Sequence, residues 1–328
     1  MLVLCGDLGG TKTLLQVAEF KQGNYRVLFQ ERFISSDFNS LIPMLDVFLN
    51  KYQKDYSSMI SSACFAVAGP VKENSAHITN LDWQIETKSI AKQFNIKRIK
   101  LVNDFYAVAS AIDILNNDDL LTLQNGNRPQ LANRAIIGAG TGLGTAMQIW
   151  TGEKHHVVST EAGHISFAPG DKIQLELLDY LMREQHQVSY ENILSGNGLK
   201  KIYQFLLHKT NSDDYLHNLM LNDDAAAIIS EYGLSGKDSI AAQTLDIFVN
   251  IYGRQAGNLA LSCLAYGGVY IAGGIAAKNI DKFEDGQFIN AFNNNRQMGH
   301  LLNNMPVYVI TNLNVGLIGA AYIASQLK

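Results

Sequence analysis

Apolar residues follow two different spacings along the first third of the chain, and these spacings predict its secondary structure. Runs that are continuously apolar, or that alternate with polar neighbours, indicate strands; apolar residues recurring every three or four positions indicate helices. The run 63–68 is apolar throughout, as expected of a central strand covered on both faces. We predict strands over 2–5, 14–20, 25–34, 63–68 and 99–102, and helices over 41–52, 86–94 and 105–115.

The same order begins again in the middle of the chain. We predict a strand over 135–137, a glycine-rich turn over 138–145 and strands over 146–150 and 156–159. Because a strand, a Gly/Thr turn and a strand stand near the start of each half, we interpret the chain as an internal duplication. The expected fold is α/β, with two lobes that each hold a mixed β-sheet with flanking helices, and with a ligand cleft between the lobes.

The second half adds further elements and sets the expected domain limits. We predict helices over 174–182 and 237–266, strands over 267–275 and 306–310, and a closing helix from residue 314. The small lobe is expected at residues 1–110, completed by the C-terminal helix at about 312–328, and the large lobe at 111–311.

Composition narrows the possible partners. The chain has 328 residues, of which 47% are hydrophobic and 17% charged, and its formal net charge is −4. No block of Lys and Arg is long enough to follow a phosphate backbone, so we expect no nucleic-acid partner. The three cysteines lie far apart, which favours a reducing cytoplasm over a disulfide framework or a zinc cluster. The N-terminus does not resemble a signal peptide, and glycines interrupt the uncharged run 255–277, so we expect no membrane span.

Two glycine-rich turns carry candidate phosphate-binding chemistry. The first, Gly6–Thr13, joins two strands and therefore differs from a P-loop or a Rossmann turn, both of which lead into a helix. Glycines let backbone N–H groups approach an anion closely, and Asp7 beside them could hold a hydrated Mg²⁺. The alternative is an ordinary glycine hairpin.

Asn103 and Asp104 stand at the carboxyl end of a predicted strand, where a helix begins. That edge of an open α/β sheet is where ligands bind. The simpler interpretation is that Asp104 is only the N-cap of the helix.

Three further polar positions stand beside predicted strand or helix ends. Glu161 and His164 share a short loop that contains Gly163, so their side chains could point the same way. Glu191 lies near a helix start, where the alternative role is a capping acid. The pair Gly273–Gly274 ends a buried strand and could let a flat ring such as adenine lie against the backbone, or it could be an ordinary strand-to-helix turn.

Taken together, these stretches resemble the bacterial glucokinase family, within the superfamily of sugar kinases, actin and heat-shock chaperone ATPases. The matching segments occur in family order and span nearly the whole chain: Gly6–Thr11, Asn103–Phe105, Gly138–Gly144, Glu161–His164, Leu194–Gly196, Gly257–Leu261 and Gly268–Ile275. The resemblance implies a two-lobed actin-like ATPase fold, the substrates glucose and ATP, the cofactor Mg²⁺, and a homodimer in the cytoplasm that feeds glycolysis.

The resemblance also assigns roles to individual residues. Asp104 would be the catalytic base and Asp7 would serve magnesium through water. Sugar hydroxyls would be bound by Asn103, Asp104, Glu161, His164 and Glu191. ATP would be bound by Gly6, Asp7, Leu8, Gly9, Gly10, Thr11, Gly140, Thr141, Gly142, Gly273 and Gly274.

Three positions depart from the family pattern. Lys12 stands where Asn is common, Ala162 where Gly is usual and Val315 where Pro is usual. Lys12 could contact phosphate or only reach solvent. The zinc-binding cysteine cluster of the related repressor branch is absent from the sequence, which argues against that branch.

The mechanism expected from these residues is general-base phosphoryl transfer. Asp104 would take the proton from the 6-hydroxyl of glucose as that oxygen attacks the γ-phosphorus of ATP. Sequence spacing does not fix hydroxyl stereochemistry, so a kinase for mannose, fructose or an N-acetylhexosamine is an alternative. More distant hypotheses are a non-catalytic sugar-binding relative, a DNA-binding sugar regulator and an actin-like filament ATPase. The filament ATPase leaves Glu161, His164 and Glu191 without a role.

Overall fold

The computed structural model describes residues 1–21, 24–52, 60–78, 81–127, 131–222 and 224–327. The chain divides into two compact units, residues 1–116 with 314–328 and residues 117–313. Each unit is built around its own sheet and is described by itself.

The sheet of the first unit has five strands in the order β3-β2-β1-β4-β8. The strands β1 to β3 form an antiparallel meander, and β4 and β8 continue the sheet in parallel to β1. Their bounds are Leu2–Leu8 (β1), Lys12–Lys21 (β2), Asn24–Ile34 (β3), Ile60–Val67 (β4) and Ile99–Asn103 (β8). A separate three-stranded antiparallel sheet comprises β5 (Val71–Lys72), β6 (Ser75–Ile78) and β7 (Trp83–Glu86).

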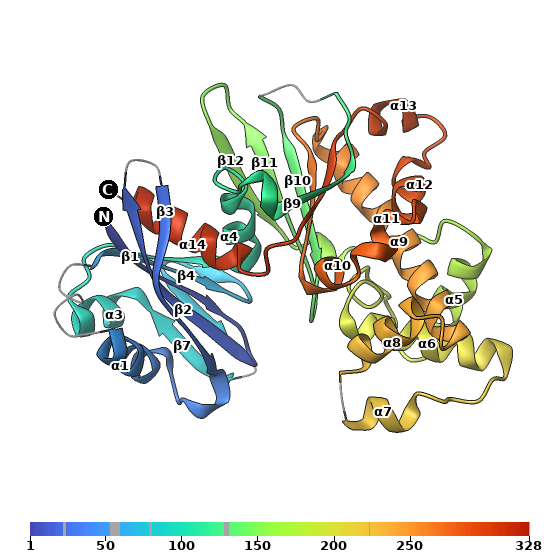
Figure 1. The fold of residues 1–328 in the computed structure, drawn as a ribbon, viewed down its shortest axis with the longest axis horizontal. Coiled ribbons are helices and arrows are strands. Elements are labelled where there is room, and N and C mark those ends of the chain that lie inside the picture. The colour runs from blue at the N-terminus through green and yellow to red at the C-terminus, as the bar shows by residue number, and fades with distance from the viewer. Residues whose placement is uncertain (22–23, 53–59, 79–80, 128–130, 223, 328) are drawn as a thin grey trace. The chain divides into compact units, whose positions relative to one another are not determined.

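Alternate residues of β1 face two different cores. Leu4 and Leu8 belong to one core with residues of α1 (Leu41–Tyr52) and α3 (Thr87–Phe94). Val3 and Cys5 belong to the second core, with residues of α4 (Asp104–Ala111) and α14 (Val315–Gln326). The period of two along a strand therefore buries both faces of this sheet. In Figure 1, α14 and α4 lie together against the sheet, although about 200 residues separate them along the chain.

Helices α4 and α14 approach closely because a glycine stands at their contact. A Cβ added to Gly319 of α14 would lie 1.8 Å from the backbone oxygen of Ala107 in α4. Only a residue without a side chain fits at this distance, so Gly319 fixes the C-terminal helix against the helix that begins at Asp104.

The sheet of the second unit repeats this topology. Its order is β12-β11-β10-β13-β14-β9. An antiparallel meander is again followed by two parallel strands, and β9 adds an antiparallel edge. The bounds are Leu120–Gln124 (β9), Arg134–Ala139 (β10), Leu143–Trp150 (β11), His155–Thr160 (β12), Val269–Ala272 (β13) and Val307–Ile310 (β14). The shared strand order confirms the predicted duplication.

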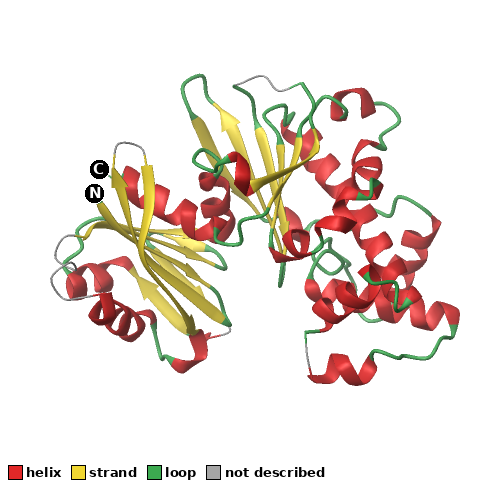
Figure 2. Ribbon diagram, viewed as in Figure 1, coloured by secondary structure: helices red, strands yellow, loops and turns green. Residues whose placement is uncertain are grey.

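Helices make up much of the second unit beside the sheet, as Figure 2 shows by colour. The longest is α9 (Ser239–Cys263), which is buried along most of its length and contacts β10 and α12. The remaining helices are α5 (Lys172–Met182), α6 (Gly196–Thr210), α7 (His217–Asn222), α8 (Ala225–Leu234), α10 (Gly274–Lys278), α11 (Ile280–Glu284), α12 (Gln287–Asn293) and α13 (Gly299–Leu302). A large hydrophobic core joins these helices to the sheet.

The structure corrects the predicted limits of both glycine-rich turns. Strand β1 continues through Gly6 to Leu8 and β10 continues to Ala139, so the turns span only 9–11 and 140–142. Gly6 pairs with Leu15 and Phe65, and a Cβ there would lie 2.8 Å from the Phe65 ring and 2.9 Å from Leu15. Glycine at this position provides space within the sheet instead of ending the strand.

Two predicted helices are shorter than expected. Helix α4 ends at Ala111, not at residue 115, and α9 spans Ser239–Cys263 within the predicted 237–266. At the C-terminus of α9, Leu264 adopts a left-handed conformation with φ +50°. Such a residue ends a helix even without glycine.

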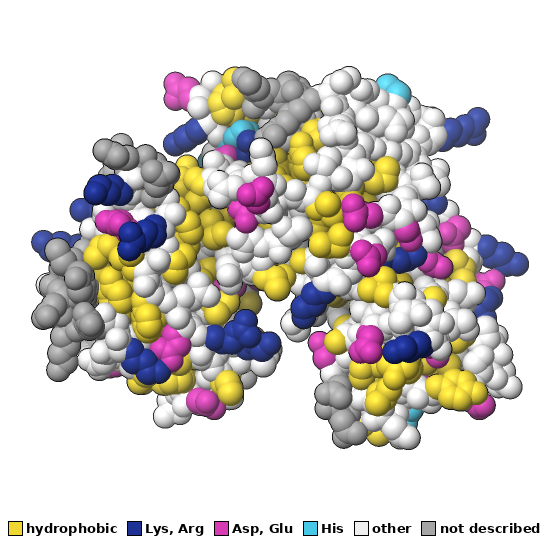
Figure 3. Space-filling view, viewed as in Figure 1, with side chains coloured by type: hydrophobic (Ala, Val, Ile, Leu, Met, Phe, Trp, Pro, Cys, Tyr) yellow, Lys and Arg dark blue, Asp and Glu magenta, His cyan; other side chains and the backbone are white. Residues whose placement is uncertain are grey.

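Surface charge and hydropathy add two observations. On the face shown in Figure 3, Lys and Arg side chains are scattered among acidic ones. Among the residues that the structure describes, no helix is long and apolar enough to cross a membrane.

Candidate functional site

Asn103, and not Asp104, caps helix α4. The Oδ1 atom of Asn103 accepts hydrogen bonds from the backbone N–H groups of Phe105 at 2.9 Å and Tyr106 at 3.2 Å. Its amide nitrogen donates to the carbonyl of Gly69 at 3.4 Å. The interpretation of Asp104 as the N-cap is therefore wrong, because Asn103 already satisfies the first N–H groups of the helix.

Asp104 is the first residue of α4 and is half-buried. Its Oδ1 accepts the N–H of Phe105 at 2.8 Å, which fixes the carboxylate at the helix N-terminus. Negative charge is stabilised at that end of a helix. The position gives Asp104 a defined orientation without using it as a cap.

Asp7 forms a carboxylate pair with Asp104 within the first unit. Burial raises the pKa of Asp7 from 3.8 to about 6, and the charge of Asp104 acts in the same direction. The N-terminal turn of α14 also approaches Asp7, since a Cβ on Gly316 would lie 3.4 Å from Asp7 Oδ2. A buried carboxylate that also feels a second negative charge favours binding of a cation.

The first glycine turn is held by hydrogen bonds at both ends. The N–H of Gly9 donates to the carbonyl of Lys12 at 3.0 Å, and Ser35 Oγ donates to the carbonyl of Gly9 at 2.8 Å. The Ser35 N–H donates to the carbonyl of Thr11 at 3.1 Å. The side chain of Lys12 is exposed at the start of β2. Of the predicted ATP residues, Gly6 and Leu8 are buried in β1, whereas Gly9, Gly10 and Thr11 form the accessible turn.

Glu161, His164 and Glu191 lie together in the second unit. The Nε2 of His164 is 3.9 Å from Glu161 Oε2, and its Nδ1 is 3.7 Å from Glu191 Oε1. The backbone N–H of Glu191 donates to the carbonyl of Gly163 at 2.9 Å, which joins the two loops. The side-chain separations exceed a hydrogen bond, so both carboxylates and the imidazole retain capacity for hydroxyl groups.

Glu191 also connects this cluster to the second glycine turn. Its Oε2 accepts the N–H of Leu143 at 2.9 Å, and a Cβ on Gly142 would lie 2.5 Å from the same oxygen. Ser195, not Glu191, caps the following helix α6. The capping-acid interpretation of Glu191 is therefore wrong, because its side chain reaches the turn between β10 and β11.

Ala162 replaces the usual glycine without strain. It begins the short 3₁₀ helix 162–164 and is not among the residues with positive φ. The next residue, Gly163, needs to be glycine, since a Cβ there would lie 2.1 Å from the carbonyl oxygen of Leu143. The close approach of this loop to β11 depends on Gly163, and Ala162 is compatible with it.

A cavity of about 530 Å³ opens beside the second glycine turn. Gly140 and Thr141 line one part of it and Gly274 another. Strands β10 and β13 are parallel neighbours, so their carboxyl ends bring these residues together. Gly273 lies at the join with φ +88°, and a Cβ there would lie 2.3 Å from the carbonyl oxygen of Ala139. The cavity has the size of a small-molecule site.

Sequence reasoning missed the opposite side of this cavity. The further lining residues come from α6, α8 and α10 and their flanks: Gly196, Asn197, Asp224, Ala226, Ala227, Ser230, Glu231, Leu234, Ile275, Lys278 and Asn279. Of these, Gly196 and Ile275 belong to segments on which the family resemblance rests. Asp224 caps α8 by accepting the N–H of Ala226 at 3.1 Å, an ordinary helix start that carries no ligand signal.

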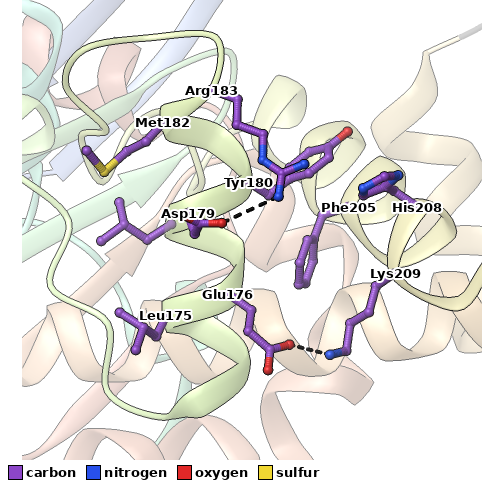
Figure 4. Close-up of a pocket in the computed structure, with 10 residues that line it drawn as sticks. Leu175, Glu176, Asp179, Tyr180, Met182, Arg183, Phe205, His208 and Lys209 are labelled. Atoms are coloured by element: carbon purple, nitrogen blue, oxygen red, sulfur yellow. Dashed lines mark hydrogen bonds and ion pairs between the residues drawn. The ribbon is translucent and has the colours of Figure 1, made fainter.

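A groove of about 580 Å³ lies elsewhere in the second unit, between α5 and α6 (Figure 4). Leu175, Met182 and Phe205 line it. The ion pair Glu176–Lys209 joins α5 to α6 across the groove, whereas Asp179–Arg183 runs along α5. None of the described residues that line this groove is a predicted site residue, so size alone does not locate the chemistry.

No cluster of three or more His, Cys, Asp or Glu side chains suited to a metal occurs among the described residues. The carboxylate pair Asp7–Asp104 still suits Mg²⁺, which is commonly held by one or two carboxylates with waters and substrate phosphates.

Comparisons of sequence and of structure match this chain to known proteins over nearly its whole length. Residues 4–327 match the family model described as Glucokinase. A glucokinase of Nostoc sp. is 41% identical over 342 residues, covering 99% of both chains, and one of Synechocystis sp. is 37% identical over 346 residues, covering 98% of both. The crystal structure of glucokinase from an Antarctic psychrotroph aligns with a TM-score of 0.85 at 30% identity, covering 99% of both chains. A ROK family glucokinase from Streptomyces griseus, in complex with glucose and AMPPNP, aligns with a TM-score of 0.67 at 19% identity, covering 99% of this chain and 100% of that one.

Proposed function

This chain belongs to the glucokinase family and is an ATP-dependent glucose kinase, and from that premise we propose which of its residues carry the reaction. The observation that carries the proposal is the arrangement around Glu191. One carboxylate lies beside a candidate sugar-binding histidine and also contacts the glycine turn next to a nucleotide-sized cavity.

The second unit would bind the substrates. Glu161, His164 and Glu191 would exchange hydrogen bonds with glucose hydroxyls, since a polyol needs several such partners. The adenine would occupy the cavity lined by Gly274, with Gly140–Gly142 offering N–H groups to the phosphates. The glucose and AMPPNP bound in the Streptomyces griseus structure support this proposal by analogy of fold.

The first unit would supply the base. Asp104 would accept the proton of the glucose 6-hydroxyl as its oxygen forms a bond to the γ-phosphorus, while the bond from that phosphorus to the β–γ bridging oxygen breaks and ADP leaves. Asn103 uses Oδ1 to cap α4, so its NH₂ group would be the part that meets the sugar. The Gly9–Thr11 turn would contact phosphate.

Asp7 fits a magnesium role because of its own environment. Its pKa is raised by burial and by the negative charge of Asp104, and a divalent cation offsets both effects. Mg²⁺ bound there through water would neutralise charge on the phosphates. Asp7 itself would orient that hydrated ion and would be ionised when it is present.

The cellular location, the metabolic role and the oligomeric state are proposed from the family resemblance alone. We propose that the protein works in the cytoplasm at the entry to glycolysis and forms a homodimer. Sedimentation velocity measures the assembly: a single species of about twice 36.1 kDa supports the dimer, and a monomer at micromolar concentration contradicts it.

The experiment that tests the sugar assignment is a coupled assay of ADP release across glucose, mannose, fructose and N-acetylglucosamine. The highest kcat/KM is expected with glucose. A higher value with another hexose would reassign the substrate, and ADP release that no sugar stimulates would contradict the kinase role itself.

A further inference from the structure

A separate cavity of about 200 Å³ lies in the second unit behind the loop 168–170. Tyr190, Arg254, Asn258 and Asn295 are among the residues that line it, and none of its described lining residues is Asp or Glu. No described residue lines both this cavity and the nucleotide cavity, or both this cavity and the α5–α6 groove. The proposed reaction uses none of the side chains in this cavity.

Arg254 is the one charged side chain among the described residues that line the cavity. Its Nε donates to Asn250 Oδ1 at 3.3 Å, and no carboxylate in the described part of the chain forms an ion pair with its guanidinium. The nearby Asp171 is already engaged, since its Oδ1 accepts the N–H of Gln174 at 3.0 Å and its Oδ2 the side-chain amide at 2.9 Å. A cation without a carboxylate partner in a concave polar site attracts an anion.

The loop holds the guanidinium in place by close packing. A Cβ on Gly170 would lie 2.4 Å from Cζ and Nη1 of Arg254. The side chain therefore lies directly against the Gly170 backbone. A planar guanidinium fixed in this way presents several N–H donors in one direction, the geometry that binds tetrahedral oxyanions.

Tyr190 and Asn258 add neutral hydrogen-bonding groups. Asn258 Nδ2 donates to the Tyr190 hydroxyl oxygen at 3.4 Å. Burial raises the pKa of Tyr190, although the positive charge of Arg254 acts in the opposite direction. The hydroxyl is therefore a protonated donor at neutral pH, and it is close enough to Arg254 to feel its charge.

We propose that this cavity binds a tetrahedral oxyanion of the phosphate class, held by the guanidinium of Arg254 and the hydroxyl of Tyr190. The ligand is either free inorganic phosphate or the phosphoryl group of a sugar phosphate. Both sources share the same recognition chemistry, a dianion with several acceptor oxygens.

Isothermal titration with inorganic phosphate at constant ionic strength tests the proposal. Saturating AMPPNP and Mg²⁺ fill the nucleotide site, so that phosphate bound there does not contribute. The wild-type protein is expected to show one saturable site, and Arg254→Gln to weaken it at least tenfold while kcat is retained. Arg183→Gln is the matched control, because it removes an arginine of the same unit whose partner is Asp179, and its binding should match the wild type.

A second variant keeps the test decisive if Arg254→Gln misfolds. Asn295→Asp retains the Oδ1 that accepts from Gln297 and Met298, and it places a negative charge in the cavity, so phosphate binding should again be lost. Glucose 6-phosphate is titrated in parallel with inorganic phosphate. The ligand that binds more tightly to the wild type, and loses affinity in Arg254→Gln, is the one for which the cavity is suited. Equal phosphate affinity in the wild type and Asn295→Asp, or the absence of saturable binding of either ligand to the wild type, would overturn the site.

Discussion

Replacing Asp7 with Asn should stabilise the protein in the absence of nucleotide and metal while removing its activity. The ionised Asp7 is disfavoured in the folded state by burial and by the neighbouring Asp104. Its pKa rises from 3.8 to about 6, and each tenfold change in the acid dissociation constant corresponds to about 1.4 kcal/mol, so the largest penalty is about 3 kcal/mol. Because the side chain is half-buried and retains some solvent contact, we expect about 1–3 kcal/mol.

The sign of the pH dependence follows from the protons bound by each state. Below pH 3.8 the carboxyl is protonated in both the folded and the unfolded chain, and Asp7 contributes no penalty. Between that pH and about 6 the folded state binds more protons than the unfolded state, so stability falls as the pH rises. Above about 6 the penalty is complete. The advantage of Asp7→Asn should therefore be nearly absent around pH 4 and full at about pH 7.5.

Thermal unfolding of the wild type and Asp7→Asn across this pH range measures the effect. An increase on the order of 2–5 °C at about pH 7.5 is expected. Asp46→Asn, at a half-buried aspartate of α1 in the same unit, is the matched control and should change the midpoint little. Mg²⁺ with ATP should raise the midpoint of the wild type more than that of the variant. An Asp7→Asn midpoint equal to or below the wild type at neutral pH would refute the reasoning.

Three further outcomes follow from the geometry. Asp104→Asn should lower kcat about 10²–10⁴-fold with glucose and ATP still bound, as measured by coupled assay and titration; near-normal turnover would exclude it as the base. Glu191→Gln should raise the KM for glucose about tenfold to a hundredfold, because the amide loses the stronger charged acceptor; an unchanged KM would remove Glu191 from sugar binding. Gly319→Ala should destabilise the protein by several kcal/mol, because its Cβ would lie 1.8 Å from the carbonyl oxygen of Ala107. Gly196→Ala serves as the control, because the added Cβ there meets only an ordinary 3.5 Å contact. Equal unfolding midpoints for the two variants would contradict the close packing of α4 and α14.

The sequence was a good guide to the fold because hydrophobic spacing reports burial directly. Residues 63–67 of the continuous apolar run do belong to a strand buried on both faces, β4, whereas Ala68 lies beyond the end of the strand and is exposed. The predicted limits of the two turns were wrong because a glycine can either make space inside a strand or allow a tight turn, and the sequence does not distinguish these two roles. Gly6 gives room to Phe65 and Leu15 inside a strand, whereas Gly9 bends the chain.

The sequence predicted only part of the candidate site, because local sequence places a residue along a strand or helix but does not specify its hydrogen bonds or its long-range packing. Asn103 and Asp104 are adjacent, and hydrophobic spacing placed both at a strand end, but which one caps α4 depends on three-dimensional hydrogen bonds. The side of the proposed nucleotide cavity formed by α8 could not be predicted from local sequence, because Ala226 and Ser230 have the pattern of an ordinary helix face. Long-range packing, not motif spacing, puts them beside Gly140.

The hydrogen bond from Leu143 to Glu191 has a consequence for the order of events in turnover. The Glu191 carboxylate contacts both the 140–142 turn, which is proposed to bind the triphosphate, and the His164 imidazole, which is proposed to bind the hexose. A movement of either one would therefore be transmitted through the Glu191 side chain. Occupancy by glucose should therefore tighten the nucleotide, and nucleotide should tighten glucose by the same factor, as linkage requires. Such reciprocity would leave the nucleotide more weakly bound when no glucose is present.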